Sequence, residues 1–149
     1  MNAKKPLPPS YLFASIVTMI ALHFLFPLAK PLHFPWNLFG ILPLSFGIVI
    51  NIVADRAFKN HGTTVKPFEE PTALITGGMF RVSRHPMYLG FVLILLGIAV
   101  FVGSLTPYAV IIAFAILMEV VFIRVEERML QEKFGQAWQV YKKKVRRWI

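Results

Sequence analysis

Apolar residues run along this chain in long stretches that contain no charged side chain. Lys, Arg, Asp and Glu are absent from Pro6 to Ala29, from Pro31 to Ala54 and from His85 to Met118, which are stretches of 24, 24 and 34 residues. A helix needs about 20 apolar residues to cross the hydrocarbon core of a bilayer. The first two stretches therefore hold one span each. The third holds two, because the turn-forming segment 103–107 lies in its middle.

The pattern predicts four transmembrane helices, near Tyr11–Leu28, Phe39–Ala54, Pro86–Val102 and Pro107–Ile123. Backbone polar groups find no water inside a bilayer, so continuous apolar runs cross it as helices. A membrane β-barrel would show apolar and polar residues in alternation, and these runs do not alternate. The first stretch follows a basic start like that of a signal peptide. Its apolar run is too long for one and no small-residue cleavage site follows, so we expect a retained span.

Composition and charge agree with a membrane protein. Hydrophobic residues make up 56% of the chain and charged residues 15%, whereas soluble domains carry about 25% charged residues. With four spans, the N-terminus, the segment 55–85 and the C-terminal tail share one side, which carries 15 of the 16 Lys and Arg residues and leaves Lys30 opposite. This asymmetry predicts that both termini are cytoplasmic. Topology and attraction to anionic lipid explain the net charge of +9, so no nucleic-acid partner is expected.

Two segments outside the spans have patterns of their own. The segment from Asp55 to His85 is long for a connection and rich in apolar residues, which predicts an ordered, functional loop. The tail 124–149 continues as a helix with one apolar stripe, formed by Val125, Met129, Leu130, Phe134, Trp138, Tyr141 and Val145. Beyond Phe134 this stripe favours a helix that lies on anionic lipid.

Ionisable residues gather where the third and fourth spans meet the cytoplasm. Pro86 suits the first turn of a helix, which places Arg84 and His85 at a helix N-terminus that favours anions. Glu126 and Glu127 follow the fourth span, and Glu119 lies seven residues before Glu126, on the same face of a regular helix. An ionisable residue inside a span is a functional candidate. The chain has no cysteine, which excludes disulfides, zinc–thiolate sites and thiol nucleophiles, and no metal is expected.

The order of these segments along the chain points to a protein family more specifically than any one segment does. The run T-G-G-M-F-R-V-S-R-H-P-M-Y-L-G (76–90) is followed by a helical hairpin, by Glu126-Glu127, and by F-G-x-x-W-x-x-Y (134–141) with a basic end. In this arrangement the chain resembles the isoprenylcysteine carboxyl methyltransferase and phospholipid methyltransferase superfamily, in its small prokaryotic-type members. The resemblance covers roughly Gly62 to Ile149, and the preceding hairpin matches only in hydropathy.

The resemblance implies an all-α, polytopic membrane enzyme with four transmembrane helices, a long ordered cytoplasmic loop and a C-terminal amphipathic helix. It implies one domain, 1–149, made of an N-terminal hairpin (1–56) and a cofactor-binding part (57–149), in the prokaryotic cytoplasmic membrane. The implied cofactor is S-adenosyl-L-methionine. Its expected ligands are Thr72, Ala73, Leu74, Ile75, Phe80, Arg84, His85, Pro86, Met87, Tyr88, Glu126 and Glu127.

The residue types suit that cofactor. Arg84, His85 and the helix N-terminus suit its carboxylate, Glu126 its ammonium, and apolar residues its adenine. We assign no general base, because methyl transfer from a sulfonium depends on alignment and the exclusion of water.

The methyl acceptor is expected to be a lipophilic or lipidated molecule from among the membrane lipids, with a prenylcysteine-like carboxylate or a lipid headgroup. Prenylcysteine enzymes often have a His near Thr72 and a longer acidic run at Glu126, and this chain has neither. Two other classes remain open: a nicotinamide-dependent enzyme like the sterol reductases, which are much longer, and a small non-enzymatic transporter or partner subunit.

Overall fold

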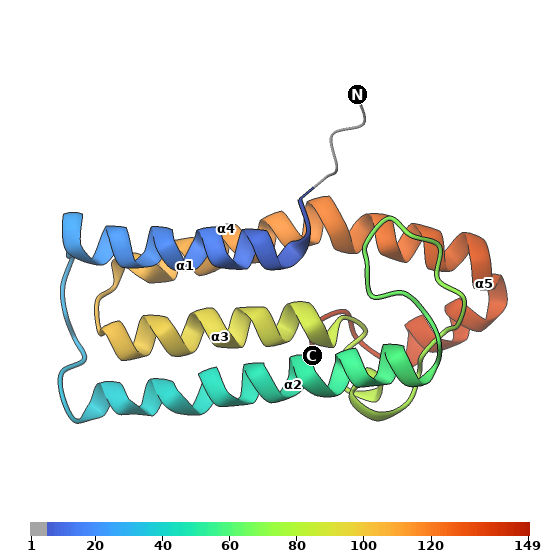
Figure 1. Cartoon of the computed structure of the whole chain (residues 1–149), viewed down its shortest axis with the longest axis horizontal. Helices are drawn as coiled ribbons and strands as arrows, with labels where there is room; N and C mark the ends of the chain where they lie inside the picture. Colours follow the sequence, from blue (N-terminus) through green and yellow to red (C-terminus); the bar gives the residue numbers. More distant parts are fainter. Residues whose placement is uncertain (1–5) are drawn as a thin grey trace.

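The computed structural model describes residues 6–149, and these form helices and no strands. Four helices lie side by side with alternating direction (Figure 1): α1 (Pro8–Leu25), α2 (Ile41–Asn60), α3 (Pro86–Val102) and α4 (Thr106–Met118). A π-helical turn, η3 (Glu119–Ile123), continues α4 into α5 (Arg124–Lys144). Two short 3-10 helices precede α2 and α3, namely η1 (Trp36–Gly40) and η2 (Gly78–Arg81). Lys4 and Lys5, which enter the charge asymmetry, lie outside the described residues.

Local sequence signals set the ends of the helices. α1 starts at Pro8, earlier than the apolar pattern predicts, because proline suits the first turn of a helix. It also ends slightly earlier than predicted, at Leu25. α3 has the predicted bounds, because Pro86 occupies its first turn and Gly103 ends it in the left-handed conformation (φ 81°). α2 runs further than predicted, to Asn60, and its last turns carry an ion pair between Asp55 and Lys59 (2.6 Å).

The outer surface of the helices is apolar. Within residues 6–149, three helical stretches are long and apolar enough to cross a membrane, Pro8–Leu25, Trp36–Asn60 and Thr106–Lys144, and α3 is an apolar helix of 17 residues. Large side chains point outward along them, among them Phe13, Phe24, Phe46, Ile112 and Ile116. A continuous apolar surface of this kind belongs in lipid, where no water is present to oppose it. The chain is an integral membrane protein.

Each helix of the first half packs against a helix of the second half. α2 packs along α3, and α1 packs along α4 (Figure 1). Two glycine pairs bring α3 close to α2 and to η1, which precedes α2. A Cβ on Gly47 would lie 2.4 Å from the carbonyl oxygen of Gly90, and a Cβ on Gly40 would lie 2.4 Å from that of Gly97. Close packing of this kind holds membrane helices together, because burial away from lipid gives them no hydrophobic gain.

The C-terminal helix folds back on the bundle. Gly135 lies inside α5 with φ 47°, outside the helical region, and the second half of the helix turns back toward the loop (Figure 1). Trp138 (1% exposed) and Tyr141 (6%) are thereby buried against Ile75 and Phe80 of the loop. The expectation of a lipid-bound helix beyond Phe134 is therefore wrong. The apolar stripe packs on the protein's own loop, since the turn at Gly135 brings the two together.

Candidate functional site

A cavity of about 220 Å³ lies where the loop, the start of α3 and the start of α5 meet. Its wall is mainly apolar. The polar residues that line it include Arg84, His85, Tyr88 and Glu126.

The structure brings most of the predicted site residues together on this cavity. Those that line it are Ala73, Leu74, Ile75, Phe80, Arg84, His85, Pro86, Met87, Tyr88 and Glu126. Thr72 does not line the cavity. Its hydroxyl donates to the Gly62 carbonyl oxygen and its N–H donates to Thr63 Oγ1, both at 3.0 Å, so it shapes the loop. Glu127 lies behind the wall, with 7% of its side chain exposed.

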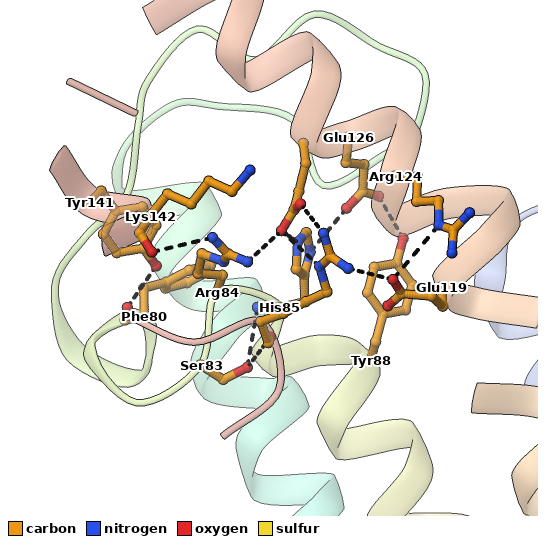
Figure 2. Close-up of polar contacts among 12 residues, drawn as sticks. Phe80, Ser83, Arg84, His85, Tyr88, Glu119, Arg124, Glu126, Tyr141 and Lys142 are labelled. Carbon is orange, nitrogen blue, oxygen red and sulfur yellow. Dashed lines mark hydrogen bonds and ion pairs between the residues drawn. The ribbon is translucent and has the colours of Figure 1, made fainter. Parts of the chain in front are cut away.

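The start of α3 fixes the orientation of His85. Pro86 occupies the first turn, and His85 is the residue just before the helix. The backbone N–H of His85 donates to Ser83 Oγ at 3.2 Å, and the Ser83 hydroxyl donates in turn to the carbonyl oxygen of Arg147 at 3.1 Å. The buried His85 ring therefore points toward the carboxylates of α5 (Figure 2).

Glu126 presents a carboxylate to the cavity. Its side chain is 24% exposed, and its Oε2 lies 3.3 Å from His85 Nδ1. The Tyr88 hydroxyl donates to Glu126 Oε1 at 2.5 Å. Tyr88 and Glu126 are each the third residue of their helix, so this bond joins the first turns of α3 and α5 (Figure 2).

Glu127 is surrounded by cationic side chains. Its Oε1 lies 2.9 Å from an Arg84 terminal nitrogen and 3.4 Å from His85 Nε2. Arg147 forms a further ion pair with it. A buried carboxylate is stable only when charge and hydrogen bonds compensate its lost hydration, and these three partners provide that compensation.

The same carboxylates control the charge of His85. Burial lowers the pKa of the imidazole, but hydrogen bonds and negative charge from Glu126 and Glu127 outweigh burial, so the pKa of His85 is raised above 6.5. Burial also lowers the pKa of Arg84 from its ordinary value, against the opposing effect of the Glu127 charge. The site is a compact network of paired charges beneath an apolar cavity.

Several residues of the cavity wall were not predicted as site residues. They come from the start of α1 (Leu7, Pro8, Pro9), from the loop (Thr64 to Glu69 and Pro71), from Phe58 and Phe91, and from α5 (Met129, Leu130, Trp138, Tyr141). The apolar stripe of α5 was a usable signal for the last group. The start of α1 carries no local signal, because only the packing of α1 beside the loop brings it to the cavity.

Fold and cavity together define a class: a helical integral membrane protein with a pocket built by one loop, the start of α3 and the C-terminal helix. Comparison with known proteins gives the family. The model of the phospholipid methyltransferase family matches residues 36–137. The chain belongs to this family.

Two relatives illustrate the range of similarity. Protein-S-isoprenylcysteine O-methyltransferase A of Arabidopsis thaliana is 32% identical over 128 residues, which cover 81% of this chain and 62% of the plant protein. This chain therefore spans less than two thirds of that relative's length. An uncharacterised protein of Haemophilus influenzae is 38% identical over 63 residues, which are 42% of this chain and all of the relative. The predicted superfamily is confirmed, and the family match starts at Trp36, so it also includes α2.

Proposed function

We propose that this protein is an S-adenosylmethionine-dependent methyltransferase that acts on a lipophilic acceptor dissolved in the membrane. One observation carries the proposal. Residues from three separate segments, which the family resemblance assigns to the cofactor, converge on one cavity: Ala73–Ile75, Arg84–Tyr88 and Glu126.

The groups around the cavity fit the parts of this cofactor. The carboxylate of Glu126 suits an ammonium group, and the apolar side chains of Leu74 and Ile75 suit the adenine ring. For the cofactor's carboxylate, the first turn of α3 offers the N–H groups of Met87 and Tyr88, which have no acceptor inside the helix.

This proposal gives Arg84 and His85 a different role from the one that the sequence suggested. Each is already paired with a carboxylate of the protein. Arg84 Nε, however, is buried without a hydrogen-bond partner among residues 6–149, which leaves one donor of this cavity-lining residue unused. We assign both residues chiefly to orienting the acidic pair, with Arg84 retaining one donor for a bound anion.

The protein's own contribution to methyl transfer is alignment in a dry site. When bound, S-adenosylmethionine supplies an activated methyl group on its sulfonium. The Tyr88–Glu126 hydrogen bond keeps the Glu126 carboxylate in one orientation at the cavity. The apolar wall excludes water, which favours attack by the acceptor over hydrolysis.

The acceptor approaches from the membrane side. The cavity reaches Leu7 and Pro8 at the start of α1 and Phe91 in the second turn of α3, all of which are apolar. A lipophilic molecule can occupy this part of the cavity. The cofactor enters at the other end of the cavity, which lies at the basic loop and tail and therefore faces the cytoplasm. A prenylcysteine-like carboxylate and a lipid headgroup are the two acceptor classes that we consider.

Calorimetric titration of the detergent-solubilised protein tests the cofactor assignment. We expect binding of S-adenosylmethionine and of S-adenosylhomocysteine, and none of NADPH. Binding of NADPH alone would favour a reductase of the sterol-reductase type. Absence of binding by all three compounds would contradict an enzyme of either kind and favour a transporter or a partner subunit.

A further inference from the structure

The last residues of the chain return to the site. The carbonyl oxygen of Arg146 accepts the backbone N–H of Arg84 at 3.0 Å, and that of Arg147 accepts the hydroxyl of Ser83 at 3.1 Å. The C-terminal segment thus holds the two residues directly before His85. These bonds use backbone atoms of the tail, so they dock it without regard to its side chains.

The side chain of Arg147 makes a second and more specific attachment. Its Nε donates to Glu127 Oε1 at 3.1 Å, one terminal nitrogen bonds Glu127 Oε2, and the other bonds Glu119 Oε1. A guanidinium that grips one carboxylate with two donors fixes that carboxylate in position and direction. Arg147 thus holds Glu127 in addition to Arg84 and His85.

The π-helical turn makes this arrangement possible. In a regular helix of about 3.6 residues per turn, residues seven apart share a face, which would place Glu119 with Glu126. A π turn takes up one extra residue. Because η3 lies between them, Glu127 shares the face of Glu119 and both reach Arg147, while Glu126 is left to face the cavity.

We propose that Arg147 is a positioning residue of the site: by clamping Glu127 it sets the orientation of His85 and Glu126 for the bound cofactor. The inference rests on the proposed function, since it concerns the same pocket. Arg147 does not line the main cavity, so its effect passes through Glu127. The residues matched by the family model end at 137, before Arg147.

Arg146 provides a matched control. It is the preceding residue, has the same side chain and is exposed, whereas Arg147 is partly buried. The two substitutions Arg147→Gln and Arg146→Gln remove the same charge from the same segment. They leave the backbone bonds of the tail to Ser83 and Arg84 available.

The test measures the affinity of the full chain in detergent for S-adenosylhomocysteine. We expect Arg147→Gln to weaken affinity by about tenfold or more, in line with the loss of charge-assisted hydrogen bonds. Arg146→Gln should stay within about twofold of the unaltered protein.

The pH dependence separates a positioning role from a general loss of structure. Without Arg147, the charge of Glu127 is balanced by Arg84 and by protonated His85, so the defect should be smaller at pH 6 than at pH 8.5. The groups that face His85 from the loop, α3 and α5 are Arg84, Tyr88, Glu126 and Glu127. Arg147→Lys, which restores one ion pair but not the two-donor grip, should recover part of the affinity.

The outcomes are distinguishable. If the unaltered protein fails to bind S-adenosylhomocysteine, the proposed function fails, and the inference with it. If it binds, and Arg147→Gln binds equally well or shows the same loss at both pH values, the positioning role alone is overturned. Should Arg147→Gln fail to fold, Arg147→Lys is compared with Arg146→Lys, and equal affinity of these two overturns the inference.

Discussion

The Tyr88 hydroxyl donates a hydrogen bond to Glu126 Oε1 at 2.5 Å, across 38 residues of sequence. This bond joins the two segments that the sequence singles out, the R-H-P start of α3 and the acidic pair of α5. Together with the contact to His85 Nδ1, it holds the carboxylate of Glu126 in one orientation at the cavity.

Glu126→Gln is therefore expected to weaken binding of S-adenosylhomocysteine. Losing a charge-assisted hydrogen bond costs about 1.5–3 kcal/mol, or roughly one to two decades in affinity. Isothermal titration of the purified protein measures the change. Glu132→Gln, at an exposed position on the same helix, is the control and should bind as the unaltered protein does. Equal affinity of the two variants would show that Glu126 does not bind the cofactor.

His85→Ala and Pro86→Ala should separate a ligand role from a structural one. His85→Ala removes the ring that contacts Glu126 and Glu127, so we expect lower cofactor affinity. Pro86→Ala should change the melting temperature little, because proline in a first turn mainly preorganises the backbone. Affinity and melting temperature are measured on both variants. Unchanged affinity in His85→Ala would mean that the ring serves the structure of the site and not the binding of the cofactor.

Protonation of His85 should make the stability of the protein depend on pH. The pKa of His85 is raised in the folded state, so its contribution to stability is complete below about 6.5, the unfolded value, and is lost as pH rises through the folded pKa. The difference in melting temperature between the unaltered protein and His85→Gln should therefore be largest near pH 6 and shrink toward alkaline pH. A difference that grows with pH would contradict the assignment.

The glycine contacts between α2 and α3 should be intolerant of added volume. In Gly47→Ala the new methyl group would meet the carbonyl oxygen of Gly90 at 2.4 Å, and backbone cannot move aside cheaply. We expect a loss of about 1–3 kcal/mol in the free energy of unfolding, seen as a lower melting temperature in detergent. Gly77→Ala is the matched control, because no atom lies within 4 Å of the added group. Equal melting of both variants would show that the helices are not packed this closely.

The charge asymmetry predicts the orientation in the membrane. A fluorescent protein fused after Ile149 should fluoresce, and alkaline phosphatase fused there should be inactive, because the tail faces the cytoplasm. A fusion after Lys30 should give the opposite pattern. Phosphatase activity at Ile149 would contradict the four-span topology and the proposed cytoplasmic entry of the cofactor.

The sequence alone predicted the helices and part of the pocket. The length of each uncharged stretch is set by the thickness of a bilayer, and Pro86 and Gly103 mark the ends of α3 by local backbone geometry. These signals are local and can be read from neighbouring residues. The family motifs then identified Glu126 and the segment 84–88, which line the cavity.

Only the tertiary structure decided which partners these residues meet. The turn at Gly135 sends the C-terminal helix back, so that Arg147 reaches Glu127, and the π turn at η3 moves Glu127 onto the face of Glu119. Neither effect is visible in the periodicity of the sequence. A single extra residue in one turn rotates everything after it, and a change in chain direction decides contacts between segments that share no local pattern.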